Sequence, residues 1–473
     1  MDGLTDLLLG VDVGTTRTKA AVVDAAGREL SWGSVPTRWH QVATGAETSA
    51  QGLLGGVLQA IDAALQSAPP GRVVGAGVTS MAETAVFLDD DGRPTAPSIV
   101  WHDSRGEEEG AALEEAFGSR GFAHHTGLPA SALCTVAKLK WLSGHGQVAP
   151  TRILSVADWV VYALGGEQAS EGSLASRTGA LDVPGRRWWE EPVQWAGVPR
   201  SAFAPLVQAG ASLGKARLDR ASEVMGASDG FAGPSPSFST ELQRLEGAAL
   251  TSAGHDHLCA AVGAGVTSAA QVLDSCGTAE AFVRAVARLD GDALVRAVEA
   301  GLCVSWHIVP GHDVLLVGSP LGMVLDRLLH LLGVTGAEAV SRLDQRAGGV
   351  QPGRLRVVSN GFFEDPSVLG LHAEVSPEAL WTAALDEVSS HAARDLRMTS
   401  NFGSQAEELV LSGGWARCAG LRRRRRGLLP RLRWPDVTEA GARGAALFGG
   451  CAAGLFANPA GFPAPLDRLL SPA

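Results

Sequence analysis

The stretch GVDVGTTRTK, residues 10–19, places an aspartate, two glycines, three threonines and two basic residues close together. A phosphate needs several hydrogen-bond donors, and a Gly/Thr turn offers closely spaced backbone N–H groups and hydroxyls. The residues with suitable groups are Gly14, Thr15, Thr16, Arg17, Thr18 and Lys19. Asp12, just before the turn, is placed to hold Mg²⁺ directly or through water. A plain hairpin whose threonines favour strands explains these residues equally well, and a Walker A motif is absent.

Asp256 is a second candidate for chemistry. It lies between Gly254 and the apolar run 258–262, which predicts a position in the first turn of a helix. The positive end of that helix would keep the carboxylate ionised and attract Mg²⁺ or phosphate. An ordinary helix N-cap is the alternative, because aspartate is favoured there for structural reasons.

The elements around these residues predict an α/β fold. Apolar runs at 7–12, 19–24, 28–35 and 72–80 indicate strands, and the apolar spacing over 47–66 indicates an amphipathic helix. Residues 269–286 repeat the opening layout of strand, acidic residue, Gly-Thr turn and strand. We therefore expect two related halves, with a boundary near residue 245 after the Gly/Ser/Pro-rich stretch 226–239.

The composition excludes several other classes of protein. A length of 473 residues is too great for one core, and a net charge of −11 argues against a general nucleic-acid binder. The six cysteines form no CxxC pair, so we expect reduced thiols and no structural zinc. No signal-peptide pattern and no apolar stretch of about 20 residues is seen, which predicts a cytoplasmic protein that does not contact a membrane.

Seven segments in chain order resemble the FGGY carbohydrate kinases, the group that holds glycerol kinase and xylulokinase. The segments are 10–24, 78–105, 155–167 (SVADWVVYALGGE), 253–265 (AGHDHLCAAVGAG), 274–280 (DSCGTAE), 409–417 (LVLSGGWAR) and 438–454. The resemblance implies two ribonuclease-H-like domains of the actin-like ATPase superfamily around a central cleft. Residues 1–245 would bind sugar and carry the first phosphate loop. Residues 246–473 would carry the catalytic aspartate, the second phosphate loop and the adenosine site.

The same resemblance assigns roles to particular residues. Asp256 would be the general base and, with Asp12, would hold Mg²⁺ of Mg-ATP. The nucleotide would be held by Gly14, Thr15, Thr16, Lys19, Gly277, Thr278, Gly413, Gly414 and Arg417. The acceptor would be held by Glu83, Trp101, Asp103, Asp256 and His257. For Asp158 a contact with hydroxyls and a buried helix-capping role both stay open, and His257 could equally be a helix-surface histidine.

The sequence also departs from the best-known relatives. Xylulokinases typically show Q-M-H-G where this chain has MAET at 81–84, so Glu83 replaces a ketose-contacting histidine. Glycerol kinases carry an arginine where this chain has Ala82, and a tyrosine where it has Leu133. The acceptor expected from this pattern is a different sugar, polyol or cyclitol.

Two further stretches look unlike the family. Residues 226–251 lack the short apolar strand that usually leads into the catalytic segment, and residues 422–426 are all arginine. The arginine run could be a solvated helix face, an anion patch, a means of attracting the phosphates of the nucleotide, or an anomaly without function. These stretches motivate an alternative: a weak or inactive kinase-like regulator that binds sugar or nucleotide. Another actin-like ATPase is less consistent with the W-x-D-x-R and AGHDH segments. A homodimer is compatible with either hypothesis.

Overall fold

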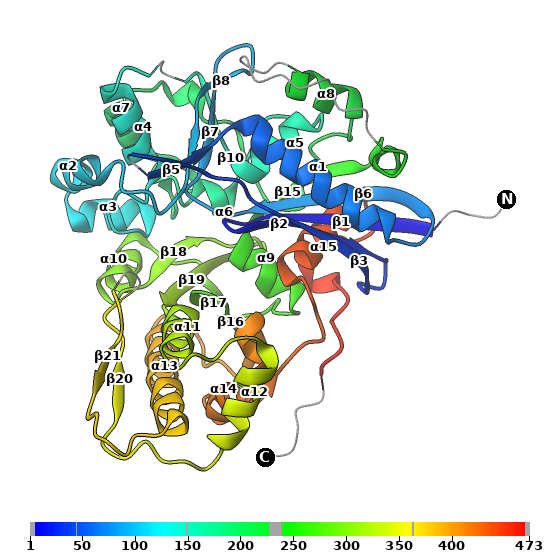
Figure 1. Ribbon diagram of the computed structural model, residues 1–473. Coiled ribbons are helices and arrows are strands. Elements are labelled where there is room, and N and C mark those ends of the chain that lie inside the picture. The colour runs from blue at the N-terminus through cyan, green and yellow to red at the C-terminus, as the bar shows by residue number, and fades with distance from the viewer. Residues whose placement is uncertain (1–4, 44, 148–149, 227–238, 362–363, 469–473) are drawn as a thin grey trace.

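The computed structural model describes residues 5–43, 45–147, 150–226, 239–361 and 364–468. Figure 1 shows two lobes, each built on its own sheet, with helices α9 (Asp256–Gly263) and α15 (Ala440–Ala452) between them. Strands and helices alternate through both lobes, so the predicted α/β class is confirmed. Within the described residues no helix is long and apolar enough to cross a membrane.

The first lobe is organised around a five-stranded sheet in the order β15-β6-β1-β2-β3. The first three strands form the antiparallel meander predicted from the opening residues, and β6 and β15 add parallel to β1. Their bounds are β1 (Thr5–Val13), β2 (Arg17–Val23), β3 (Glu29–Pro36), β6 (Gly71–Ser80) and β15 (Ala249–His255).

The second lobe repeats this arrangement. Its sheet has the order β18-β19-β17-β16-β22-β23, in which β16 and β17 form the second hairpin and β22 and β23 add parallel to β16. The predicted duplication is therefore confirmed in the strand order of the two sheets. The bounds are β16 (Gln271–Cys276), β17 (Glu280–Ala287), β18 (Cys303–Trp306), β19 (His312–Ser319), β22 (Glu408–Ser412) and β23 (Arg431–Arg433).

Two helices cover opposite faces of the first sheet. A Cβ added to Gly10 would lie 1.7 Å from the carbonyl oxygen of Ala442 on α15, whereas one added to Gly33 would lie 2.4 Å from that of Ala60 on α1 (Ala50–Gln66). Gly10 is opposite Ala21 and Gly33 is opposite Ala20, and neighbouring residues of one strand point to opposite faces. The glycines are therefore required by close backbone packing on both faces.

The expected division at residue 245 does not follow the sheets. Strand β15 comes after that point yet pairs with β6 in the first sheet, and α15, near the end of the chain, packs on β1, β6 and β15. The strand that the sequence seemed to lack before Asp256 is thus present as β15. Most of the expected linker, residues 227–238, lies outside the described residues. We place the boundary between the lobes after residue 255, and α15 belongs with the first lobe.

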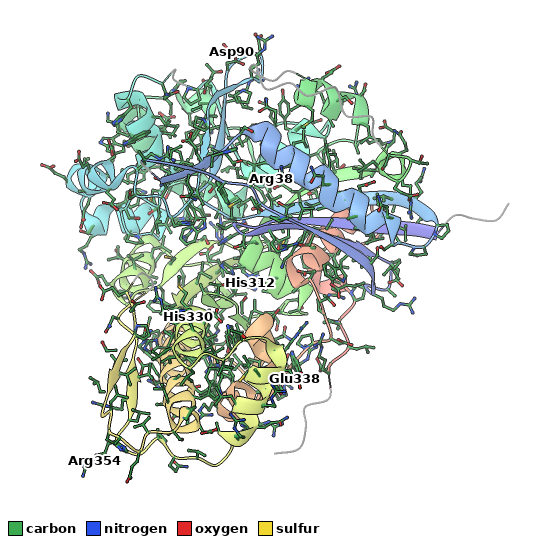
Figure 2. All side chains as sticks on the ribbon, in the orientation of Figure 1. Arg38, Asp90, His312, His330, Glu338 and Arg354 are labelled. Atoms are coloured by element: carbon green, nitrogen blue, oxygen red, sulfur yellow. The ribbon has the colours of Figure 1, made fainter. Side chains whose placement is uncertain are left out.

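The remaining elements surround the two sheets, and side chains fill both lobes (Figure 2). The charged residues Asp90 and Arg354 lie at opposite ends of the molecule. The other helices are α2 (Glu107–Phe117), α3 (Ser119–Thr126), α4 (Thr135–Gly144), α5 (Val156–Ala163), α6 (Gly172–Ala175), α7 (Glu190–Trp195), α8 (Leu218–Gly226), α10 (Gly291–Glu299), α11 (Leu321–Leu331), α12 (Ala337–Arg346), α13 (Pro377–Ser400) and α14 (Ala419–Arg425). Short 3₁₀ turns cover Arg200–Ala202, Leu242–Leu245, Gly414–Arg417 and Pro459–Gly461. The short strands are β4 (His40–Val42), β5 (Gly45–Thr48), β7 (Ala85–Leu88), β8 (Pro94–Ala96), β9 (Ser98–Ile99), β10 (Arg152–Ser155), β11 (Ser170–Glu171), β12 (Leu181–Asp182), β13 (Arg187–Trp188), β14 (Leu206–Val207), β20 (Arg356–Val358) and β21 (Ser367–Leu369).

Candidate active site

Strand register brings the predicted residues of the first lobe to one edge of its sheet. Val13 at the end of β1 is opposite Ser80 at the end of β6, and Ser80 is opposite His255 at the end of β15. The three segments that follow these strand ends carry the Gly/Thr turn, Glu83 and Asp256. Residues more than 200 positions apart in the chain therefore share one edge, as the site requires.

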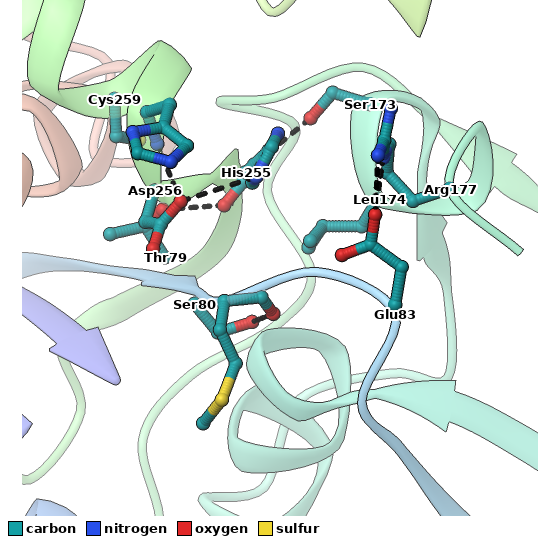
Figure 3. Close-up of polar contacts among 12 residues, drawn as sticks. Thr79, Ser80, Glu83, Ser173, Leu174, Arg177, His255, Asp256 and Cys259 are labelled. Carbon is teal, nitrogen blue, oxygen red and sulfur yellow. Dashed lines mark hydrogen bonds and ion pairs between the residues drawn. The ribbon is translucent and has the colours of Figure 1, made fainter. Parts of the chain in front are cut away.

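Asp256 is the first residue of α9, and only one of its two carboxylate oxygens has polar partners among the described residues. The backbone N–H of His257 donates to Oδ1 at 2.6 Å, and His255 Nε2 lies 3.2 Å from the same oxygen (Figure 3). Burial lowers the pKa of His255 well below its usual value, so the ring is neutral. Oδ2 accepts no hydrogen bond from another described residue and is free to accept a proton. Asp256 is not the N-cap of α9; that residue is His255.

Asp12 lies on β1, within electrostatic range of Asp256. Its Oδ1 is buried without a hydrogen-bond partner, and a Cβ on Gly441 at the start of α15 would come within 2.4 Å of Oδ2. Burial, and next the charge of Asp256, raise the pKa of Asp12 to about 7, with Lys19 opposing the shift. A buried carboxylate oxygen with no partner beside a second carboxylate is suited to a divalent cation.

The basic residues of the Gly/Thr turn are already engaged within the protein. Lys19, opposite Asp12 on β2, forms a 2.7 Å ion pair with Glu439, and Arg17 donates through Nε to Ser34 Oγ at 2.6 Å. The hydroxyl of Thr18 is buried against Thr37. Of the residues predicted to contact phosphate, Thr16 is exposed, Gly14 and Thr15 are half-buried, and Lys19 is already paired with Glu439.

Trp101 connects the expected acceptor site with the expected phosphate turn. Its Nε1 donates to the Thr15 hydroxyl at 2.9 Å, and Trp39 Nε1 donates to the Thr15 carbonyl at 2.7 Å. The Thr15 hydroxyl in turn lies 3.6 Å from the sulfur of Met81. The two indoles fix the orientation of the turn, a role that the sequence did not indicate for Trp39.

The second Gly-Thr turn lies at the corresponding edge of the other sheet. Ser275 near the end of β16 is opposite Ser412 at the end of β22, so Gly277 and Thr278 lie beside Gly413 and Gly414. Gly413 has φ +87°, and a Cβ there would lie 2.5 Å from the Cys276 carbonyl oxygen, whereas a Cβ on Gly414 would meet open space. Gly413 is thus required for packing, and Gly414 leaves room beside the turn. Arg417 is exposed at the end of the following 3₁₀ turn.

Glu83 is held in place by an arginine that the sequence did not single out. Arg177, just after α6, donates to Glu83 Oε1 through Nε at 2.6 Å and through Nη2 at 2.5 Å (Figure 3). Glu83 has φ +62°, a left-handed conformation that is uncommon for residues with a side chain. The Thr135 hydroxyl donates to its carbonyl oxygen at 3.1 Å. Arg177 lies in a stretch without periodicity, so no local signal identified it.

Asp103 does not face the site, contrary to its predicted role as an acceptor ligand. Its carboxylate accepts from the Ala46 N–H at 2.6 Å and from Arg105 Nε and Nη2, each at 2.9 Å, and the side chain is fully buried. Both oxygens are therefore used to fix the loop after β9.

Asp158 is likewise buried and accepts from the Ser155 hydroxyl at 2.7 Å, which favours the structural role. His257 packs its ring 5.4 Å from that of His255, beside Asp256.

Glu171 supports the turn that leads into Asp256. Its buried Oε2 accepts from the backbone N–H groups of Ser173 and Leu174 and from the Ser173 hydroxyl, which itself accepts from the His255 N–H at 3.0 Å. Burial raises the pKa of Glu171 to about 8; the Ser173 hydrogen bond opposes this, and the charge of Asp158 adds to it. The carboxyl is therefore protonated at neutral pH.

Replacing Glu171 by Gln should flatten the dependence of stability on pH. The folded protein keeps a proton on Glu171 that the unfolded chain releases above its ordinary pKa, so this group makes stability fall as pH rises from about 4.5 to about 8. Glu171→Gln should remove this decrease in the free energy of unfolding, which is on the order of a few kcal/mol. Urea unfolding followed by circular dichroism at pH 5 to 9 measures the change. The exposed Glu167→Gln is the matched control, and parallel curves for Glu171→Gln and wild type would contradict the assignment.

The two sheets share the order of five strands, and each presents a Gly-Thr turn at its edge, which defines a two-domain α/β protein. Residues 7–231 match the model of the N-terminal domain of the FGGY family of carbohydrate kinases. The first lobe of the chain is thus similar to the N-terminal domain of that family.

Individual relatives agree with that assignment. The chain is 27% identical to a glycerol kinase of Geobacter sp. (strain M21) over 95% of its own length and 91% of that relative. It is 24% identical to a gluconokinase of Bacillus subtilis (strain 168) over 43% of its length and 40% of that relative; the matches to this protein and to two Thermococcus glycerol kinases thus span about two fifths of those relatives. A xylulose kinase structure from Rhodospirillum rubrum superposes with a TM-score of 0.80 at 23% identity, covering 94% of this chain and 92% of that one.

Proposed function

We propose that this protein transfers the terminal phosphate of ATP to a hydroxyl of a small sugar, polyol or cyclitol. One observation carries the proposal: Asp256 Oδ1 accepts from the His257 N–H and lies 3.2 Å from His255 Nε2, with Oδ2 left free, at the edge that also carries the Gly/Thr turn and Asp12. The relatives named glycerol kinase, gluconokinase and xylulose kinase support the same reaction class.

The chemistry at Asp256 follows from its geometry. The acceptor hydroxyl oxygen bonds to the γ-phosphorus, the bond from that phosphorus to the β,γ-bridging oxygen breaks, and ADP leaves. The hydroxyl proton passes to Asp256 Oδ2. Because the transition state is loose, positioning and charge stabilisation supply most of the acceleration. His255 and the N–H of His257 keep the carboxylate in one rotamer, so that the free oxygen stays directed to the acceptor.

Mg²⁺ fits the residues around Asp12. The buried, unpartnered Oδ1 of Asp12 and the neighbouring Asp256 carboxylate are oxygen ligands of the kind that Mg²⁺ prefers, directly or through water. The ion would neutralise charge on the phosphate oxygens of ATP. Asp12 and Asp256 would hold it, while Gly14, Thr15, Thr16, Gly277 and Thr278 would surround the phosphates, and Gly413, Gly414 and Arg417 the nucleoside.

The acceptor we propose is neutral and rich in hydroxyls. Glu83 and Arg177 offset one another's charge, and Asp256 and Asp12 leave the surroundings negative, which disfavours an anionic acceptor. The cavity of about 20 Å³ lined by Glu83 holds no more than one water, so it does not accommodate the acceptor. Ala82 and the half-exposed Leu133 replace polar residues of the glycerol kinases.

A screen of acceptors tests this function. Pentuloses, hexuloses, alditols and cyclitols are incubated with the protein and Mg-ATP, and ADP release is coupled to NADH oxidation while the phosphorylated product is identified by mass spectrometry. We expect ADP release only with a subset of neutral polyhydroxy acceptors, and none with aldonates. Acceptor binding without phosphorylation across the panel would instead support a non-catalytic regulator on this fold. The regulator was suggested by residues 226–251 and by the arginine run 422–426. Both depart less from the family than the sequence indicates, because strand β15 is present before Asp256 and Arg425 is buried.

A further inference from the structure

The arginine run at 422–426 contains one residue that is unlike the rest. Arg425 is fully buried, whereas Arg423 is exposed, and Arg424 pairs with Asp386 at the surface. Arg422 stacks its guanidinium 4.1 Å from the ring centre of Trp434. The expectation of a solvated helix face therefore fails for Arg425, and the expectation that the run attracts phosphates cannot apply to a side chain without access to solvent.

Arg425 lies between two buried carboxylates that flank the second Gly-Thr turn. Its Nε donates to Asp274 Oδ2 at 2.7 Å, and its Nη2 pairs with Glu280 Oε1. Asp274 is on β16 three residues before Gly277, and Glu280 begins β17 two residues after Thr278. One guanidinium thus joins the two strands at the base of the turn, 145 residues or more along the chain from either carboxylate.

The remaining hydrogen-bonding groups of this cluster are also satisfied. Glu280 Oε2 accepts from the Ser319 hydroxyl at 2.6 Å, Asp274 Oδ1 lies 3.1 Å from Cys276 Sγ, and Arg425 Nη1 donates to Ser389 Oγ at 3.0 Å. Asp274, Cys276 and Glu280 are close enough to hold a metal ion, but the guanidinium already supplies the positive charge between the two carboxylates. A fully satisfied buried network of this kind fixes geometry more than it adds stability.

The same helix carries the second nucleotide segment. Arg425 is the last residue of α14, which begins two residues after the 3₁₀ turn Gly414–Arg417. Gly413, before that turn, packs its backbone against the Cys276 carbonyl, directly beside Gly277. Fixing α14 to Asp274 and Glu280 therefore fixes the distance between the turn at 277–278 and the segment at 413–417.

We propose that Arg425 is a positioning residue for nucleotide binding, which holds these two segments in the arrangement that ATP requires. The inference rests on the proposed function, because it takes ATP as the ligand of both segments. Arg425 contacts no ligand itself. Its loss should weaken ATP binding and raise the KM for ATP, with little effect on the acceptor site in the other lobe.

A triple variant separates positioning from stability. Arg425→Met alone leaves the buried carboxyl groups of Asp274 and Glu280 without the cation that bridges them and should be strongly destabilised. Adding Asp274→Asn and Glu280→Gln removes those charges and should restore cooperative folding in urea. We expect the triple variant to bind ATP about 10-fold more weakly by calorimetry, and its acceptor KM to stay within about twofold. Hydrogen exchange should be faster at 276–280 and 412–417.

Three comparisons make the test decisive. Arg423→Met, in the same run but exposed, should bind ATP as wild type does, and Arg425→Lys should give an intermediate affinity because one ammonium cannot bridge both carboxylates. A folded triple variant with wild-type ATP affinity would overturn the inference while leaving the proposed function in place. A wild-type protein that binds no ATP would overturn both.

Discussion

Asp256→Asn should lower kcat by about a thousandfold, while ATP in the absence of Mg²⁺ should still bind within about twofold of wild type. The substitution keeps the shape of the side chain and the hydrogen bond from the His257 N–H, but an amide cannot accept the hydroxyl proton. Since Oδ2 has no structural partner, the unfolding free energy should change little. Steady-state ADP release with an acceptor from the screen measures kcat, and calorimetry with ATP measures binding.

The control for Asp256 is an aspartate that only caps a helix. Asp290 is the N-cap of α10 and accepts from the Ala293 N–H at 2.8 Å. Asp290→Asn should leave kcat unchanged. If Asp256→Asn behaves like it, with kcat within a factor of about three of wild type, then Asp256 is structural and the base must be sought elsewhere.

Asp12→Asn should reduce kcat/KM by about a hundredfold or more and yet stabilise the fold. The loss of activity follows if the carboxylate holds Mg²⁺, because an amide is a much weaker ligand for that ion. The gain in stability follows from burial, which, with the charge of Asp256, raises the pKa of Asp12 to about 7. The folded state is therefore penalised for ionising Asp12, and that penalty grows as pH rises from about 4 to about 7.

The two halves of this prediction have separate measurements. In urea unfolding with EDTA present, the free energy of unfolding of Asp12→Asn should exceed that of wild type by about 1 to 3 kcal/mol at pH 8 and by less at pH 5. In calorimetry, wild type should bind ATP more tightly with Mg²⁺ than without it, and the variant should lose most of that difference. A variant that keeps the full Mg²⁺ effect would show that Asp12 is not a ligand, whatever its stability.

The sequence predicted the local elements of the site well, because they depend on neighbouring residues. The hairpin around Gly14 and the placement of Asp256 in the first turn of α9 follow from apolar runs, a tight turn and a helix start, which are short-range signals. The duplication was visible for the same reason, since both hairpins repeat one pattern of residue types. The sequence did not indicate that the neighbouring Arg105 and the distant Ala46 N–H donate to both oxygens of Asp103.

Tertiary contacts decide which of the chemically suitable residues are paired within the protein and which are left free. Arg177 reaches Glu83 across 94 positions, Lys19 is paired with Glu439, and the arginine run contains one buried residue that joins two carboxylates 145 or more positions away. The sequence by itself determined which residue types are present and which local elements they form. Only the folded chain decided which carboxylate is buried without a partner, which is neutralised by a cation and which is left free to react, because burial and pairing are set by residues distant in the chain.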